Sequence, residues 1–184
     1  NNVRYKAQKN IMLMRYHGEG ATSTPGHLDS ALKYALLTLN GGRGSLRQKE
    51  YIRALMQLAS IYTLRSEYGQ ALRYYNQIFT SNFRLNSKTV FEVNIRIALI
   101  YNNIRDYKSA QVYFDKLINI QNESQSERDL FALLLVSGEN LEKNGRYEEA
   151  FARFREVLER EKEYEFPAAR GVGLALIGEV FKSV

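Results

Sequence analysis

Few residues of this sequence have the side-chain types and the spacing that a catalytic or metal-binding site requires. The two histidines, His17 and His27, could approach each other across a turn and bind a metal, with Glu19 and Asp29 as the nearby carboxylates. Solvation at two helix ends is the simpler interpretation of both histidines. Cysteine is absent, so disulfides and thiolate chemistry are excluded. We therefore expect neither a metal nor a cofactor.

A glycine-rich stretch and a run of charges complete the candidates for a chemical site. The stretch GEGATSTPG, residues 18–26, lacks the Lys-Ser/Thr pair of a phosphate-binding loop, and no predicted strand precedes it. The run EREKEYE, residues 159–165, is typical of a solvated helix face. The remaining residues do not combine into a nucleophile, a base and an orienting group. The sequence therefore predicts a protein that is not an enzyme.

Charge is unevenly distributed along the chain. Residues 1–90 contain 13 Lys and Arg against 4 Asp and Glu, whereas residues 91–184 contain 13 against 16. A basic half can attract nucleic acid or an acidic partner, although a solvated surface explains it as well. Tyrosines could stack on bases, but many of the 13 tyrosines recur at regular positions and are assigned to packing. Nucleic-acid binding is therefore the least favoured of the functions considered.

The sequence predicts no membrane span, and any targeting signal of the parent protein would lie outside it. The longest strongly apolar run, Phe131 to Val136, is far shorter than the roughly 20 residues that a transmembrane helix needs. The N-terminal stretch NNVRYKAQKN is polar and basic and lacks the apolar core of a signal peptide. Because the sequence does not begin with Met, we expect it to be a piece of a longer protein.

Two sets of small residues recur with the same period and indicate the elements that would position any site. Small residues in one set are 40, 39 and 40 residues apart, and those in the other are 39, 40 and 40 apart. An aromatic residue follows most of them at a spacing of three or four, which keeps both on one helical face. The first set is Ala31, Ala71, Ala110 and Ala150, and the second is Ala59, Ala98, Gly138 and Gly178. Such a repeat predicts helix hairpins that must stack to bury their apolar faces.

The apolar spacing and the capping signals predict nine helices. Ser45 with Gln48 is interpreted as a capping box, and Ser87 and Ser126 as N-caps. Gly145 is expected to end one helix, and Pro167 to lie in the first turn of the last. The predicted ranges are 3–16, 27–40, 46–65, 68–81, 88–104, 107–121, 126–143, 147–164 and 167–182.

These residues resemble the tetratricopeptide repeat, whose pattern is a small residue, an aromatic three later, an alanine nine after that and an aromatic four later. The resemblance covers residues 46–184 well and residues 1–45 loosely. It implies an all-α fold, a right-handed superhelical array of antiparallel helix hairpins that forms a single domain over residues 1–184. The matching positions are Ala59, Tyr62, Ala71 and Tyr75; Ala98, Tyr101, Ala110 and Phe114; and Gly138, Leu141, Ala150 and Phe154.

The repeat length separates this sequence from the usual member of the family. The period is 39 to 40 residues instead of about 34, and the extra residues must lie between hairpins. Long repeats of this kind are similar to those of bacterial regulators and of sensor regions attached to histidine kinases. The resemblance therefore leaves three functions open: a protein- or peptide-binding scaffold, a ligand-sensing or dimerising region of a bacterial signalling protein, and a basic nucleic-acid binder.

In the family, the first helix of each hairpin lines a concave groove that binds a peptide or protein partner. Carried over to this sequence, the groove would begin cationic and end acidic, which suits a partner with an acidic segment. The set of Lys, Asn and Arg that clamps a C-terminal carboxylate in some members is missing, because Met56, Ser60, Ala132 and Val136 occupy those places. The expected groove residues are Arg53, Met56, Gln57, Ser60, Thr63, Glu92, Arg96, Leu99, Asn102, Asn103, Ala132, Leu135, Glu139 and Glu142.

The last predicted helix repeats the pattern of a first helix, although no second helix follows it in this sequence. We expect Leu174 and Ile177 to pack back on the preceding helix. The outward residues are expected to be partly charged, at Arg170, Glu179 and Lys182, and partly apolar, at Val172, Leu176, Val180 and Val184. The exposed apolar area predicts that the array continues in the parent protein or that this helix joins another copy.

Overall fold

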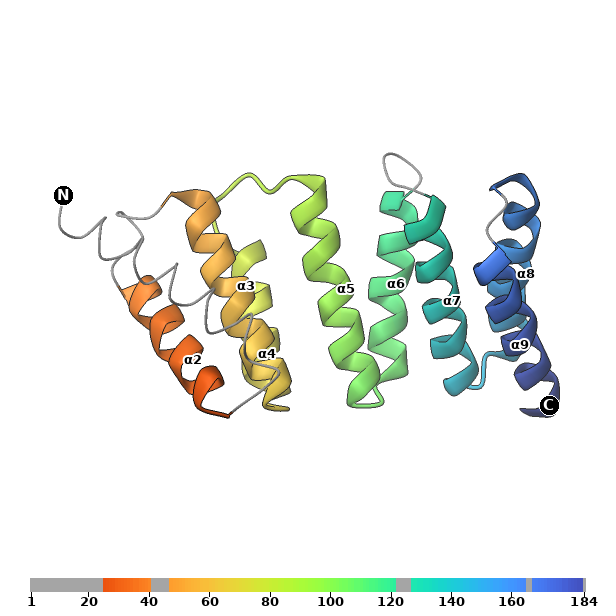
Figure 1. Ribbon diagram of the computed structural model, residues 1–184, viewed down its shortest axis with the longest axis horizontal. Coiled ribbons are helices and arrows are strands. Elements are labelled where there is room, and N and C mark those ends of the chain that lie inside the picture. The colour runs from red at the N-terminus through yellow and green to blue at the C-terminus, as the bar shows by residue number, and fades with distance from the viewer. Residues whose placement is uncertain (1–24, 41–46, 122–126, 165–166, 184) are drawn as a thin grey trace. The chain divides into compact units, whose positions relative to one another are not determined.

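The computed structural model describes residues 25–40, 47–121, 127–164 and 167–183. Within these residues every regular element is an α-helix (Figure 1). The predicted helix at residues 3–16 lies outside the described residues, and the other predicted helices are confirmed to within two residues at each end. The helices are α2 (Pro25–Asn40), α3 (Gln48–Leu64), α4 (Tyr68–Phe79), α5 (Ser87–Asn103), α6 (Tyr107–Gln121), α7 (Glu127–Lys143), α8 (Tyr147–Tyr164) and α9 (Pro167–Ser183).

The chain divides into two compact units, Asn1–Leu85 and Asn86–Val184. In the first unit, α3 and α4 form a hairpin and α2 packs against α3. In the second unit, α5 with α6 and α7 with α8 form hairpins, α6 packs against α7, and α9 packs mainly against α8. Helices α3, α5 and α7 are called first helices below, and α4, α6 and α8 second helices.

The recurring small residues hold the two helices of each hairpin close together. Ala71, Ala110 and Ala150 of the second helices are fully buried, as are Ala59 and Ala98 of the first helices. At the equivalent place in α7, a Cβ added to Gly138 would overlap the ring of Phe154. The predicted repeat register is therefore confirmed in the hairpins α3–α4, α5–α6 and α7–α8, because each small residue there leaves space that the other helix of the hairpin fills.

The same turn closes each of the three hairpins between α3 and α8. One residue adopts the left-handed conformation, with φ of 60° at Ser66, 61° at Arg105 and 75° at Gly145. The N–H of the following residue donates over 2.9 Å to a carbonyl oxygen in the last turn of the first helix, which is Tyr62, Tyr101 or Leu141. This Schellman arrangement satisfies carbonyls that the helix end leaves open. Gly145 ends its helix as predicted.

The N-cap expected at Ser87 is wrong, and α5 is capped by the residue before it. The Asn86 Oδ1 atom accepts a hydrogen bond of 2.8 Å from the Thr89 N–H, and Asn86 itself has extended backbone angles. Asn and Ser cap about equally well, so the point at which the extended chain turns decides between them. Ser126, the other predicted N-cap, lies outside the described residues.

The capping box expected from Ser45 and Gln48 is also misplaced. Helix α3 begins at Gln48 after the N-cap Arg47, and the Glu50 carboxylate accepts a hydrogen bond of 3.1 Å from the Arg47 N–H. A carboxylate in the first turn also favours the positive end of the helix dipole. Ser45 lies outside the described residues.

Helix α9 is turned differently from the sequence prediction. Ile177 packs inward as expected, but Leu174 is 54% exposed, whereas Leu176 and Val180 are buried. The reason is the small residue Gly173, where an added Cβ would lie 3.3 Å from the Leu158 Cδ2 atom. This close approach turns the side that contains Leu176 and Val180 toward α8.

Among the described helices, none is long and apolar enough to cross a membrane.

Candidate binding surfaces on the first helices

The residues expected on α3 lie along one side of that helix, in the first compact unit. Their spacing of three or four places them on one face, and all of them keep some solvent exposure. Two of the five already have partners within the fold: the Ser60 Oγ atom lies 3.2 Å from the Tyr75 Oη atom, and the Thr63 hydroxyl donates to the Ala59 carbonyl over 2.8 Å. Arg53, Met56 and Gln57 are therefore the members best placed to contact a partner.

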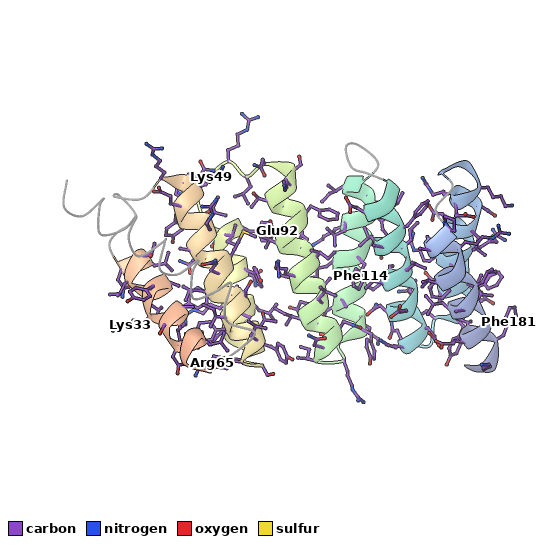
Figure 2. All side chains as sticks on the ribbon, in the orientation of Figure 1. Lys33, Lys49, Arg65, Glu92, Phe114 and Phe181 are labelled. Atoms are coloured by element: carbon purple, nitrogen blue, oxygen red, sulfur yellow. The ribbon has the colours of Figure 1, made fainter. Side chains whose placement is uncertain are left out.

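The residues expected on α5 form a corresponding surface in the second unit. An Arg96 Nη2 atom lies 3.7 Å from a Glu92 Oε1 atom, and the two side chains are 47% and 43% exposed. Such a pair one turn apart contributes only about 0.2–0.5 kcal/mol, so a ligand can rearrange it. Leu99 follows on the same side and is 41% exposed. Figure 2 labels Glu92 on α5. This side of α5 therefore offers both charges and one large apolar contact.

Two amides of the expected set have a side-chain oxygen that is buried without a hydrogen-bond partner. These atoms are Oε1 of Gln57 on α3 and Oδ1 of Asn102 on α5. A buried acceptor without a partner costs roughly 1–3 kcal/mol. The two residues are partly exposed, so rotation of either amide toward a donor of a bound segment would remove that cost.

Some of the residues expected on α7 pack into the core, and others are exposed to solvent. Leu135 packs against both core clusters of the second unit, so it belongs mainly to the interior. Ala132 is exposed, and Glu139 and Glu142 are half-buried. The α7 surface is therefore acidic. The predicted set thus gives a cationic surface on α3 in the first unit, and a mixed surface on α5 and an acidic surface on α7 in the second.

Two stacked tyrosine pairs on the hairpins were not predicted. Tyr62 stacks on Tyr74 with ring centroids 5.5 Å apart, and Tyr101 stacks on Tyr113 at 5.7 Å. Burial raises the pKa of Tyr62, and the nearby Tyr74 and Glu67 raise it further. Burial, with Tyr101 as a smaller cause, also raises the pKa of Tyr113. The sequence contained a clue to both pairs, because Tyr74 and Tyr113 directly precede the repeat-position aromatics Tyr75 and Phe114.

A polar cluster, buried at Gln111, Ser137 and Asn140 and partly exposed at Asp115 and Arg153, joins α6, α7 and α8 and was also missed. The Gln111 amide nitrogen donates to Ser137 Oγ over 3.0 Å and to Asp115 Oδ1 over 2.9 Å. The Asn140 amide nitrogen donates to the Gln111 Oε1 atom over 2.8 Å and to a backbone carbonyl. Arg153 of α8 donates to Asp115 over 3.0 Å. We call these five residues the polar cluster.

Among the described residues, no group of three or more His, Asp and Glu side chains could hold a metal ion. His17 lies outside the described residues, and so do residues 18–24 of the glycine-rich stretch. The side chain of His27 is likewise not described.

Comparisons with known proteins agree with this geometry. Residues 91–124, which include most of the α5–α6 hairpin, match the tetratricopeptide repeat family model. A putative kinesin light chain from Podosopora anserina with nearly identical TPR-like repeats is similar in structure, with a TM-score of 0.77, 14% identity, and coverage of 98% of this chain and 87% of that one. No curated protein matches the chain.

Two further solved structures share the fold. BtubC (BKLC) from P. vanneervenii has a TM-score of 0.64 and 14% identity, covering 100% of this chain and 84% of that one. A MamA RS-1 double mutant has a TM-score of 0.60 and 10% identity, covering 95% of this chain and 96% of that one. At such low sequence identities the structural similarity establishes the fold alone. Function has to be inferred from the surfaces described above.

Proposed function

Because this chain is a helical repeat protein of the tetratricopeptide type, we propose that it is a non-catalytic scaffold that binds protein or peptide segments on the exposed faces of its first helices. The α5 face supports this proposal most directly. It combines the exposed Leu99, a weak ion pair at Arg96, and the buried Asn102 Oδ1 atom without a partner. An apolar contact beside polar groups that lack firm partners is what a bound segment requires.

The charges of the two surfaces suggest which segments they bind. Arg53 lies on the α3 surface with Met56, whereas Glu139 and Glu142 lie on the α7 surface. An acidic-apolar segment complements the first surface, and a basic-apolar segment complements the second. Each surface can be tested by itself.

Charge reversal tests the two surfaces independently. The probes are two fluorescent peptides of equal length, one rich in Glu and Leu and the other rich in Lys and Leu, each titrated with the whole chain. We expect Arg53→Glu to lower the affinity for the acidic peptide about tenfold or more and to leave the affinity for the basic peptide unchanged. Glu139→Lys should do the reverse. If neither peptide binds, or if both variants affect both peptides equally, these faces are not specific binding surfaces.

An apolar substitution pair tests the α5 face. Leu99→Asp removes its apolar contact, and Val112→Asp is the matched control, because Val112 is 53% exposed on a second helix. Only Leu99→Asp should weaken peptide binding. Equal losses in both variants would indicate non-specific binding.

The signalling alternative is favoured by a different observation. Helix α9 exposes several large apolar residues, and we propose that the chain associates with a second copy through this helix. A dimerising or ligand-sensing region of a bacterial sensor kinase or transcriptional regulator would need such a contact. Sedimentation of the chain over a range of concentrations tests the association, and a constant monomer mass would contradict it.

A further inference from the structure

Helix α9 has an open face at the positions where α7 is covered. Counting back 40 residues, Leu174 corresponds to Leu134 and Phe181 to Leu141, both in α7. Leu134 and Leu141 are at most 1% exposed, whereas Leu174 is 54% and Phe181 69% exposed. The outer face of α9 is thus the one that packs inside a hairpin elsewhere in this chain.

Glycines on the same face of α9 leave open spaces between the large residues. A Cβ at Gly138 of α7 would overlap Phe154 of the second helix, but a Cβ at the equivalent Gly178 would meet nothing within 4 Å. The same is true of Gly171. The open face therefore alternates between protruding side chains and empty places that a neighbouring helix can fill.

The protruding and empty places are arranged symmetrically about Leu176. Leu174 lies two residues before it and Gly178 two after, and Gly171 lies five before it and Phe181 five after. When the open faces of two antiparallel copies meet at the level of Leu176, each Leu174 faces a Gly178 and each Phe181 faces a Gly171. Both kinds of contact form in one register, as a self-complementary two-fold interface requires.

We propose that the open face of α9 is a docking surface for the same face of α9 in a second copy, packed antiparallel about a two-fold axis level with Leu176 along the helix. This proposal rests on the proposed self-association and specifies its geometry. The contact continues the hairpin packing by one helix, because the buried side of α9 already joins the core cluster that contains Phe154 and Leu141. Phe151 of α8 supports the Phe181 ring edge to face, with centroids 5.7 Å apart. Figure 2 labels Phe181 on α9.

The size and the charge of the interface determine how tightly the copies bind. A helix of 17 residues spans about 26 Å, and one helix face offers less than the roughly 800 Å² per partner of a standard interface. We therefore expect a dissociation constant on the order of 10–100 μM. Arg170 and Lys182 lie six residues on either side of Leu176, so like charges approach across the two-fold axis. Added salt should screen them and strengthen the dimer.

Sedimentation of the whole chain measures the association and its surface. We expect a dimer to form at high protein concentration, and Leu174→Glu or Phe181→Glu to abolish it. Val172→Glu is the control, because Val172 is 46% exposed but lies on another side of α9. A monomer at all concentrations would overturn both the self-association and this geometry. Dissociation by Val172→Glu alone would assign the contact to another surface.

Disulfide trapping tests the register, since the chain has no cysteine of its own. In the proposed pair, Gly171 of one copy lies beside Lys182 of the other, whereas the same two residues within one chain are about 16 Å apart. Gly171→Cys/Lys182→Cys should therefore give a covalent dimer on oxidation, and neither single variant should, because a disulfide needs Cα atoms within about 7 Å. If single variants cross-link, or if a chain that sediments as a dimer gives no cross-link in the double variant, the antiparallel register is wrong although self-association stands.

Discussion

At the scale of single residues, the three hairpin turns show how one conformation tolerates different side chains. The turn position has φ of 60° to 75° and is occupied by Ser66, Arg105 and Gly145. The left-handed conformation costs a residue with a Cβ roughly 1 kcal/mol, whereas glycine adopts it freely. The Schellman hydrogen bonds offset this cost in the first two turns. The three turns therefore differ in stability although their hydrogen bonds are the same.

Substitutions at these turns should have opposite effects. We expect Arg105→Gly to raise the free energy of unfolding by about 0.5–1 kcal/mol, because it removes the Cβ strain. Gly145→Ala should lower it by about 1 kcal/mol for the same reason. Urea denaturation of both variants measures the changes. The explanation fails if both substitutions shift stability in the same direction.

The stacked tyrosine Tyr62 makes stability depend on alkaline pH. Burial is the largest cause of its raised pKa, with Tyr74 next. Because the unfolded chain then releases this proton at a lower pH than the folded chain, the contribution is fully present below the ordinary tyrosine pKa of about 10 and is lost as pH rises through the folded value.

Two measurements test this dependence. The urea midpoint of the chain should fall above about pH 10 more steeply than that of Tyr62→Phe. Tyrosinate absorbance should also show that Tyr74→Phe lowers the pKa of Tyr62, because it removes the neighbouring hydroxyl. Identical alkaline profiles for the chain and Tyr62→Phe would contradict the assignment.

At the scale of elements, the polar cluster replaces apolar packing between α6 and α7. Ser137 and Asn140 are almost completely buried, and the equivalent residues of α5 are Ile97 and Ile100. Asn140 Oδ1 is buried without a hydrogen-bond partner. A partly satisfied polar cluster fixes the register of two helices but stabilises them less than apolar side chains would.

Repacking the polar cluster should therefore be non-additive. We expect Gln111→Leu alone to cost about 1–3 kcal/mol, because it leaves Ser137 and Asn140 without their partner. The triple variant Gln111→Leu/Ser137→Ile/Asn140→Ile should be as stable as the original chain or more stable. Chemical denaturation of the single and triple variants gives the comparison. Additive losses would show that the hydrogen bonds outweigh the packing.

At the scale of the whole molecule, the uneven charge could support a function other than protein binding. The chain has a net charge of +6, with the excess of Lys and Arg in its first 90 residues. A basic surface alone gives non-specific DNA affinity of roughly 1–100 μM, which falls steeply with salt. The surfaces on α3, α5 and α7 combine charges of both signs with apolar residues, which suits a protein partner better.

We therefore expect only non-specific binding of duplex DNA. Fluorescence anisotropy at several salt concentrations should show an affinity that does not depend on sequence and that disappears above physiological salt. The matched measurement uses the two peptides described above under the same conditions. Tight, sequence-dependent DNA binding by the chain would favour the nucleic-acid function instead.

The sequence by itself determined the ranges of the described helices, which helices pair as hairpins, and which small residues lie between the paired helices. Repeating alanines and glycines reveal these features because close helix packing requires a small side chain at a fixed spacing. The expected positions on the first helices also follow from that register, although their role in binding stays a proposal.

Only the tertiary structure decided how neighbouring helices turn toward one another. The orientation of α9 depends on the contact between Gly173 and Leu158, and the stacking of Tyr62 depends on Tyr74 of another helix. The same holds for Asn140, whose partner Gln111 lies 29 residues away. A sequence pattern gives the face of one helix, but the rotation that buries Leu176 and exposes Phe181 results from side chains of two helices fitting together.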